Sequence, residues 1–123
     1  MLPGDGVDES TMRATAQQIY AQWDLDKSYG WDFALLAMNA ARLGNPDRAV
    51  DFLLDDRYQF TDTGYPLSGK SVVPAPYFPA AGGLLYAVAM MCAGWDGSPD
   101  SDAPGFPRDG KWKVRWEGLP SAL

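Results

Sequence analysis

Apolar residues follow two different patterns along this chain, one periodic and one continuous. Between residues 10 and 23 they recur at helical spacing, which predicts a half-exposed helix with Ser10 as its N-cap. Residues 31–44 are apolar on nearly all faces, and Asn39 and Arg42 are the polar interruptions after the first turn. This second segment predicts a buried helix that ends at Gly44, a residue type common at helix C-termini.

Two more helices are predicted further along the chain. Asn45 can cap a third helix with Pro46 at its first position, and the residues that follow place apolar and charged side chains on opposite faces. Residues 80–93 carry no charged or strongly polar side chain, so a helix formed there must be surrounded by apolar groups. Crossing a bilayer takes about 20 apolar residues, and this run is shorter and contains Gly82 and Gly83. The run therefore predicts a buried core helix rather than a membrane span.

Two segments outside these helices have patterns of their own. Residues 58–79 form a connection rich in Gly, Pro, Tyr and Ser, and a loop of this length in a compact domain is usually functional or disordered. Its tyrosines and Phe60 favour an ordered loop. Near the C-terminus, Trp112, Val114 and Trp116 alternate with cationic residues, which predicts a short β-strand with one apolar face. Since a lone strand is unstable, this one needs a partner within the long loop or outside the chain.

The order of the predicted helices is half-exposed, buried, amphipathic and buried, which indicates two layers. A helical toroid has this pattern, because its outer helices are amphipathic and its inner helices are enclosed. The chain of 123 residues is one partial domain and is too short to wrap the last helix on all sides, so part of that surround is expected outside it. Its predicted parts are outer and inner helices (10–57), a long loop (58–79), a last inner helix (80–94) and a C-terminal turn and strand (95–123).

Composition disfavours several classes of function. The formal net charge is −6 and the ten Lys and Arg are scattered, whereas a nucleic-acid site or an anionic membrane surface needs a basic stripe. We therefore expect no nucleic-acid or membrane partner. The chain has no histidine, which rules out Ser-His-Asp and Cys-His catalysis and most zinc sites. Any catalysis would have to use carboxylates or tyrosines.

Neither a metal nor a cofactor is expected. Asp96, Asp100, Asp102 and Asp109 fit no EF-hand spacing, and the Pro and Gly residues among them indicate turns. Cys92 lies inside the apolar run, where a thiol acts as a small hydrophobe more often than as a nucleophile. The first residues lack a basic region followed by an apolar stretch, so no signal peptide is predicted and the compartment stays open.

Three stretches of the chain, taken together, resemble a known enzyme family. They are SYGWDFALLAMNAARLGNPDRAVDFLL, PYFPAAGGLLYAVAMMCAGWDG and APGFPRDGKWKVRWEGL. In order and spacing they are similar to the C-terminal end of six-hairpin glycosidases, the (α/α)6-toroid enzymes related to the family 95 α-L-fucosidases and the family 65 group. The resemblance covers nearly the whole chain from about residue 10, and its most specific elements are Gly30-Trp31-Asp32, Ala41-Arg42-Leu43-Gly44, Gly82-Gly83 and the closing Trp-Glu-Gly-Leu.

The resemblance implies a mainly α fold that supplies about the last two of six hairpins of an enzyme hydrolysing a glycosidic bond. Such enzymes use a carboxylate pair, in which an acid protonates the leaving oxygen and a base activates water. The family carries its general acid on an upstream hairpin, and the positions that match its base are Pro79, Ala80 and Ala81. Because the acid lies outside the chain, the isolated chain is expected to be inactive. None of the three matching positions can act as a base, so either this subgroup uses another carboxylate or the chain comes from a member whose activity is altered or lost. Its partners would be a carbohydrate substrate and the remainder of the same toroid.

The resemblance also points to the end of the inner helices that opens to the active site. Asp32 starts a predicted buried helix there, so it is the best-placed catalytic candidate or, alternatively, a first-turn acid favoured by the helix dipole. Aromatic rings at this end could stack on sugars or pack between hairpins, and Asp62 could bind a hydroxyl or be a solvated loop acid. The candidate substrate-binding residues are Trp31, Asp32, Tyr29, Tyr65, Tyr77 and Asp62.

Two other interpretations of the chain stay open at this point. It could be a stand-alone helical interaction module whose exposed apolar helices bury against each other in a homodimer without catalysis. It could also be a truncated product with no independent function. Gly82 and Gly83 fit either a backbone approach to a ligand at a helix N-terminus or the close packing of two inner helices. Sugar specificity and the retaining or inverting outcome are not decided by these residues.

Overall fold

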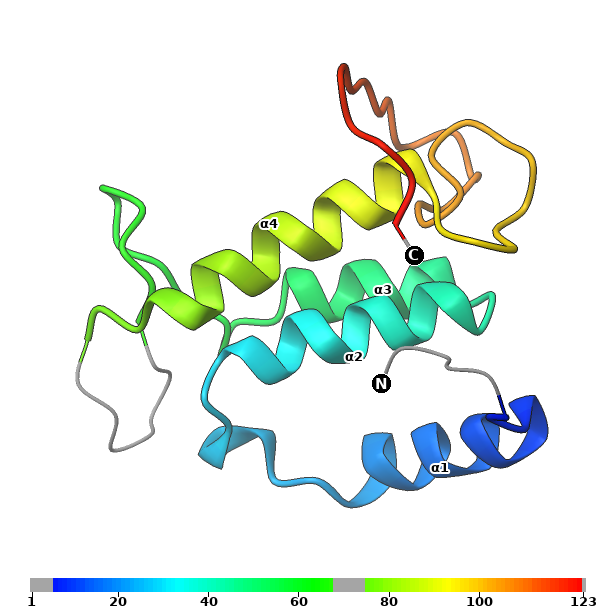
Figure 1. Ribbon diagram of the computed structural model, residues 1–123. Helices are drawn as coiled ribbons and strands as arrows, with labels where there is room; N and C mark the ends of the chain where they lie inside the picture. Colours follow the sequence, from blue (N-terminus) through cyan, green and yellow to red (C-terminus); the bar gives the residue numbers. More distant parts are fainter. Residues whose placement is uncertain (1–5, 68–74, 123) are drawn as a thin grey trace.

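The computed structural model describes residues 6–67 and 75–122, and this part of the chain is mainly helical, as the sequence predicts (Figure 1). Its elements are α1 (Glu9–Gln22), the short 3₁₀-helix η1 (Leu25–Lys27), α2 (Trp31–Arg42), α3 (Pro46–Leu53) and α4 (Phe78–Ala93). Among the described residues, no helix combines the length and hydropathy that a bilayer crossing requires.

Local capping interactions set the helix boundaries. The Asp8 carboxylate accepts the Ser10 hydroxyl at 2.6 Å and the Thr11 backbone N–H at 2.7 Å, so Asp8 caps α1 in place of the predicted Ser10. These hydrogen bonds lower the pKa of Asp8 to about 2, and the bond from the Ser10 hydroxyl has the largest effect. The cap of α3 is confirmed, because the Asn45 side-chain oxygen accepts the Arg48 N–H at 3.2 Å.

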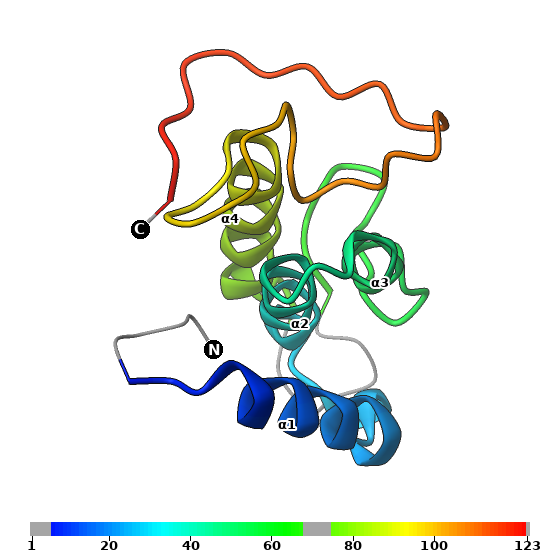
Figure 2. The same ribbon diagram turned by 90° about the vertical axis from the view of Figure 1, so that its right-hand side faces the viewer.

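α2 is the central helix, and α3 and α4 pack on different sides of it (Figures 1 and 2). Every residue from Phe33 to Ala41 is buried except Leu35, which is half-buried. Full burial of a side chain as large as Phe33 contributes about 1.5–3 kcal/mol. The predicted buried helix is therefore present and forms the middle of the core.

α4 runs beside α2 in the same direction, so both helices begin at the same end of the molecule (Figure 1). A Cβ placed on Gly30, just before α2, would lie 3.3 Å from the Ala80 Cβ near the start of α4. One placed on Gly83 would lie 3.0 Å from the Ala34 Cβ, whereas one on Gly82 would meet nothing within 4 Å. Small residues at these contacts permit a close approach of the two backbones. Gly83 is therefore a helix-packing residue.

α3 runs back beside α2 in the opposite direction, and α1 crosses α2 obliquely on the outside (Figures 1 and 2). Arg13 of α1 donates from Nη1 to the Leu43 carbonyl, just after α2, at 2.6 Å. At the other end of α1, the Tyr20 ring packs on Phe52 of α3 with centroids 5.2 Å apart, and the Arg48 guanidinium carbon lies 5.5 Å from the Tyr20 centroid. These contacts hold α1 to the core by its ends, while its polar face stays exposed.

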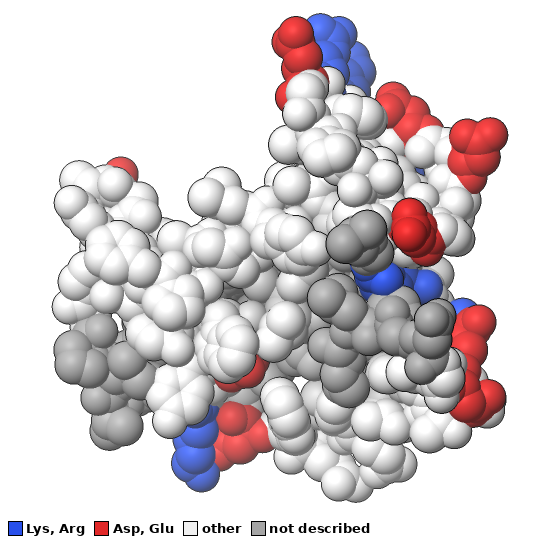
Figure 3. Space-filling model, in the orientation of Figure 1, with Lys and Arg blue, Asp and Glu red and all other residues white. Residues whose placement is uncertain are grey.

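The described residues cover only one side of α4. Met90 and Met91 are buried, but the opposite side exposes Phe78, Leu85 and Tyr86 to 62 %, 72 % and 46 %. Together with the exposed Gly82 these three residues form one stripe at helical spacing, named here the α4 face. Figure 3 shows that the surface along most of α4 carries no charged side chains. The apolar sequence of α4 predicts burial on every side, whereas the described residues bury only one side of this helix.

The predicted C-terminal β-strand is not formed among the described residues. Backbone pairing there consists of isolated bridges, one of which joins Trp95 to Ala122. The Trp112 ring packs on Phe106, with centroids 5.6 Å apart, in a segment of irregular backbone. An alternating pattern gives a segment one apolar side but cannot supply the neighbouring strand that its backbone needs.

The segment after α4 is attached to that helix at two points. Ala122 donates its backbone N–H to the Gly94 carbonyl at 2.9 Å, and its own carbonyl accepts the Asp96 N–H at 3.0 Å. Gly105 donates its N–H to the Met91 carbonyl at 3.0 Å, and a Cβ added to Gly105 would lie 2.5 Å from the Met91 Cα. Residues 94–122 therefore form a loop whose ends meet and whose middle is fixed on α4.

The described part of the long connection packs against the start of α2 and α4. Tyr58 is buried and stacks on Phe33 with ring centroids 5.5 Å apart, and its hydroxyl donates to the Ala80 carbonyl. Burial raises the pKa of Tyr58 to about 12. Residues 68–74 of the predicted loop lie outside the described residues, and α4 begins two residues before the predicted helix, at Phe78.

Replacing Gly83 with Leu should destabilise the fold, because the new side chain must displace Ala34 and separate α2 from α4. Overpacking of this kind costs about 1–3 kcal/mol, which urea unfolding followed by circular dichroism would measure. Gly82→Ala is the matched control. Its Cβ meets open space and alanine is the better helix former, so stability should rise by about 0.5–1 kcal/mol. Equal effects at the two positions would contradict the close contact.

The raised pKa of Tyr58 predicts a loss of stability at high pH. Tyrosine in the unfolded chain ionises near pH 10, whereas Tyr58 in the folded protein keeps its proton to about pH 12. The folded state binds more protons between these values, so the free energy of unfolding falls as the pH rises through this range. Tyr58→Phe removes this contribution, and its thermal stability should decline less steeply between pH 10 and pH 12. An equal decline in both proteins would show that burial does not affect this hydroxyl.

Candidate functional site

Aromatic side chains gather where α2 and α4 begin, and this group is named the aromatic end. Its members are Tyr29, Trp31, Tyr65, Tyr77 and Phe78. Tyr29 and Tyr77 directly precede the two helices with ring centroids 6.2 Å apart, and Tyr65 meets Phe78 edge-on at 6.4 Å. The structure thus brings together the four aromatic residues that the sequence predicts for the site. It adds Phe78, which sequence analysis missed although it precedes a proline at a helix start.

Four of the five rings of the aromatic end are exposed, and that of Tyr77 is half-buried. Trp31, Tyr29, Tyr65 and Phe78 are exposed to 41 %, 46 %, 53 % and 62 %. Core aromatics such as Phe33 are instead almost fully covered. Ring faces that stay in water can stack on an apolar face of a ligand, while the tyrosine hydroxyls can form hydrogen bonds.

Asp32 lies in the first turn of α2, at the aromatic end. Its carboxylate accepts the Tyr29 backbone N–H at 3.1 Å, a contact that fits the helix-start role of this acid. Gly30 between them has a φ of +81° and is buried against α4, so the chain turns sharply into the helix. Within the described part of the chain, no hydrogen bond or ion pair joins Asp32 to a second acid or to a cation.

Asp62 lies in the exposed turn that also carries Tyr65. Thr61 organises this turn: its N–H donates to the Tyr65 carbonyl at 2.8 Å, and its hydroxyl oxygen accepts the Tyr65 N–H at 2.9 Å. The Gly64 N–H donates to the Thr61 carbonyl at 2.9 Å. No hydrogen bond or ion pair to another described residue holds Asp62, so it is a solvated loop acid near the aromatic end.

The first turn of α4 offers no general base. Pro79, Ala80 and Ala81 occupy this turn, and Ala80 is fully buried. The Tyr58 hydroxyl reaches the turn by donating to the Ala80 carbonyl. Since the pKa of Tyr58 is about 12, the hydroxyl keeps its proton at neutral pH and acts as a donor, not as a base.

Cys92 lies in the last turn of α4, and the acids Asp96, Asp100, Asp102 and Asp109 lie in the segment after that helix. The described residues hold no group of three His, Cys, Asp or Glu side chains arranged to bind an ion. Asp109 pairs with Lys111 at 2.9 Å, and the hydrogen bond from that lysine lowers the pKa of the carboxyl. Burial raises the pKa of the Cys92 thiol, so it stays protonated at neutral pH and packs as an apolar group.

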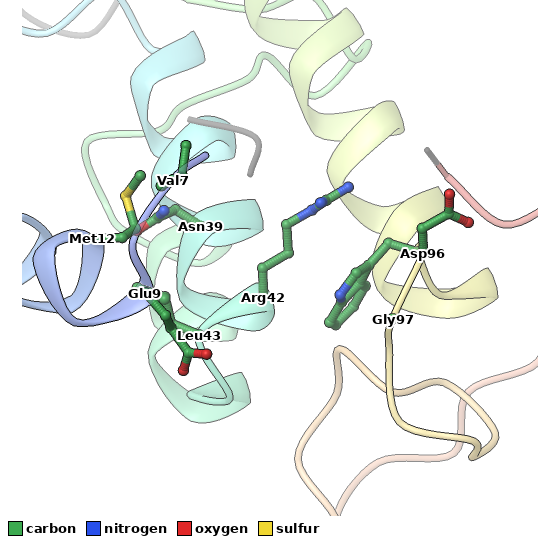
Figure 4. Close-up of a pocket in the computed structure, with 9 residues that line it drawn as sticks. Val7, Glu9, Met12, Asn39, Arg42, Leu43, Asp96 and Gly97 are labelled. Atoms are coloured by element: carbon green, nitrogen blue, oxygen red, sulfur yellow. The ribbon is translucent and has the colours of Figure 1, made fainter. Parts of the chain in front are cut away.

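A pocket of about 250 Å³ lies at the opposite end of α2 (Figure 4). Asn39 and Arg42 line it from the last turns of α2, Met12 from α1, and Trp95 and Asp96 from the segment after α4. The only sequence signal for this pocket is the presence of two polar residues in an otherwise apolar helix. The pocket was missed because the segment after α4 completes it, and sequence periodicity does not place that segment.

No family model, curated protein or solved structure matches this chain. The resemblance to six-hairpin glycosidases therefore rests on the residues quoted for it. What the aromatic end can do follows from its side chains: exposed flat rings, tyrosine hydroxyls and one carboxylate suit a small neutral polyol better than a charged ligand.

Proposed function

We propose that the chain is the C-terminal segment of a carbohydrate-active helical toroid, a glycosidase whose aromatic end binds sugar rings, and that the segment alone is catalytically inactive. The observation that carries the proposal is the parallel packing of α2 and α4, with α3 running the opposite way beside α2 and α1 crossing α2 obliquely on the outside (Figures 1 and 2). In a toroid of helical hairpins, inner helices run parallel to one another and outer helices run the other way. α2 and α4 would be inner helices, and α1 and α3 outer ones.

The α4 face supports a larger assembly of helices. Burial of apolar surface stabilises a protein by about 25 cal/mol for each Å², and surface that stays in water lacks this stabilisation. Leu85 is exposed to 72 %, and the surface along most of α4 lacks charge (Figure 3). An uncharged stripe of this kind fits contact with another apolar helix. In the proposed toroid, the inner helix of a further hairpin packs on the α4 face as α2 packs on the other side.

The aromatic end supports a carbohydrate as the ligand. A pyranose has apolar C–H faces that stack on aromatic rings, and hydroxyls that bond to carboxylates and phenols. Trp31, Tyr29 and Tyr77 provide the rings, and Asp32 provides an acceptor in the same place. All of them lie where α2 and α4 begin, which is the end on which the active site opens in the family that the sequence resembles.

Glycoside hydrolysis requires two carboxyl groups, held about 5–9.5 Å apart in most such enzymes. Asp32 is the candidate for one of them. The start of α4 holds no second one, because Pro79, Ala80 and Ala81 occupy that turn. In the proposal the second carboxyl group belongs to another hairpin, so the chain by itself binds a sugar without cleaving it.

Sugar binding at the aromatic end can be tested on the isolated chain by NMR. L-fucose and D-glucose should each be titrated, and at least one should shift the indole N–H signal of Trp31 with saturation. Trp31→Ala should abolish the saturable shifts at Tyr29 and Tyr77, because the largest stacking surface is lost. Trp116→Ala is the matched control, since Trp116 is exposed to the same 41 % as Trp31 but lies in the C-terminal segment.

Three outcomes decide this test. Binding lost in the Trp31 variant and kept in the control supports the aromatic end. Binding lost in the control instead would place the sugar on the C-terminal segment and contradict the proposal. Saturable shifts with neither sugar would count against both as ligands of the aromatic end.

The α4 face also favours a second candidate function, a helical interaction module that forms a homodimer without catalysis. Phe78, Gly82, Leu85 and Tyr86 lie at i, i+4, i+7 and i+8, so a second copy could lay the same stripe against them. A symmetric contact of this kind would bury the α4 face without any further hairpin. The two candidates therefore differ in how the isolated chain behaves.

Size-exclusion chromatography with light scattering, combined with an apolar fluorescent dye, separates the two candidates. The toroid proposal expects strong dye binding or aggregation, and Leu85→Lys should reduce both. The homodimer expects a discrete dimer with weak dye binding, which Leu85→Lys splits into monomers. Leu54→Lys, at a leucine exposed to 68 % next to α3, should change neither result. A monomer without dye binding would contradict both candidates.

A further inference from the structure

Residues 112–117 form a run of backbone that pairs with nothing in the described part of the chain. None of its backbone N–H or C=O groups makes a hydrogen bond to another described residue, whereas Gly105 before it and Ala122 after it are both bonded to the end of α4. Figures 1 and 2 show the run at the outer edge of the molecule, and in Figure 2 it is an extended trace. Exposed polar backbone of this kind is a template for a further strand.

The side chains of this run divide into an apolar side and a basic side, because neighbouring residues of an extended chain point to opposite sides. The Trp112 ring packs on Phe106 with centroids 5.6 Å apart, and Val114 lines the same hollow of about 230 Å³. The apolar side therefore faces the turn at residues 102–107. Lys113 and Arg115 alternate with these residues and point away from that turn.

The basic side carries charge that no acid in the described part of the chain neutralises. Lys113 and Arg115 are exposed and make no hydrogen bond or ion pair with another described residue, whereas Lys111 is paired with Asp109 at 2.9 Å. The formal net charge is −6, yet four of the ten Lys and Arg fall in one short stretch: Arg108, Lys111, Lys113 and Arg115. An acidic ligand is therefore repelled by most of the surface and attracted to this run.

We propose that residues 112–117 bind an acidic segment of another protein by β-strand addition. The segment is extended, alternates acidic with apolar residues, and pairs its backbone with the unpaired N–H and C=O groups of the run. Its acids lie beside Lys113 and Arg115, and its apolar residues lie beside Val114. Neither the aromatic end nor the α4 face takes part in this binding, which is therefore separate from the proposed function.

A second copy of the chain is a poorer occupant of the same edge. In antiparallel pairing centred on Val114, Lys113 of one copy lies opposite Arg115 of the other. Like charges directly opposite each other destabilise a pair of strands. Acids at the facing positions of a different segment turn the same contacts into attractive ones. The charges of the run thus favour an acidic partner over self-association.

The test is an NMR titration of the full chain with three hexapeptides that have blocked ends. The first alternates glutamate with valine, the second has glutamine in place of glutamate, and the third carries its three glutamates ahead of its three valines. We expect the first to give saturable shifts of the backbone amides of residues 112–117 and to slow their hydrogen exchange, because pairing covers these groups. The other two should bind about fivefold more weakly or worse.

The peptides separate the two parts of the proposal. Equal affinity for the first and third peptides would indicate attraction by charge alone and overturn β-strand addition. Equal affinity for the first and second would overturn the acidic partner. No saturation with the first peptide overturns both.

Proline variants test the backbone pairing. Successive residues of a strand direct their N–H groups to opposite edges, so Lys113→Pro and Val114→Pro each remove a donor from one edge. Neither N–H is hydrogen-bonded to another described residue, so the melting temperature should hold. At one of the two positions the proline variant should bind the first peptide about tenfold more weakly than the alanine variant does. Equal binding by proline and alanine at both positions would overturn the pairing.

A charge reversal assigns the attraction to the run. Lys113→Glu should weaken binding of the first peptide about fivefold, because an attractive pair becomes a repulsive one. Lys27→Glu is the matched control, since it changes the net charge equally at a side chain exposed to 83 % in η1. It should leave the affinity unchanged. Equal losses in the two variants would overturn the role of Lys113.

Two other occupants of the run would contradict the proposal. Tighter binding of oligothymidylate or of phosphatidylserine vesicles than of the first peptide would assign the run to a phosphate surface. A dimer that Val114→Pro separates into monomers would assign it to a second copy. Either result overturns the acidic segment as the occupant.

Discussion

The rest of the structure depends on the close contact between α2 and α4. Gly83 meets Ala34 at a distance that any larger residue would lengthen, and this contact keeps the helices parallel and side by side. Their first turns therefore bring exposed rings together at one end, around Trp31. Their last turns bring Arg42 to Trp95 at the other end. Two chemically different ends of the molecule, one with exposed aromatic rings and one with the polar residues Asn39 and Arg42, thus follow from one packing contact.

Sequence patterns predicted the parts of the fold that depend on near neighbours. Asn45 caps α3 and the buried α2 ends before Gly44, because these signals act within one turn of a helix. The cap of α1 was misplaced because two acceptors lie close together and the carboxylate of Asp8 binds more strongly than the hydroxyl of Ser10. The missing strand has a different cause, since pairing depends on a second segment that periodicity does not reveal.

The candidate site shows the same division between local and distant information. The rings flanking Asp32 were found from the positions of helix starts, and the structure brings those starts together. Phe78 was missed because the predicted helix began two residues too late. Asn39 and Arg42 were noticed as polar residues in an apolar helix, but their pocket is completed by a segment more than fifty residues away in sequence. Sequence alone therefore identifies a polar residue in an apolar helix but not the cavity that this residue lines.

The loop from Gly94 to Ala122 has a consequence for how this chain can vary in evolution. Its ends are joined to each other by backbone hydrogen bonds, and Gly105 fixes its middle on Met91. Doubling the length of a closed loop costs only about 0.6 kcal/mol. Insertions in its outward turns can therefore accumulate without moving the helices, whereas the position of Gly105 admits no side chain. The loop can thus diverge in length and sequence while its crossing point on α4 stays invariant.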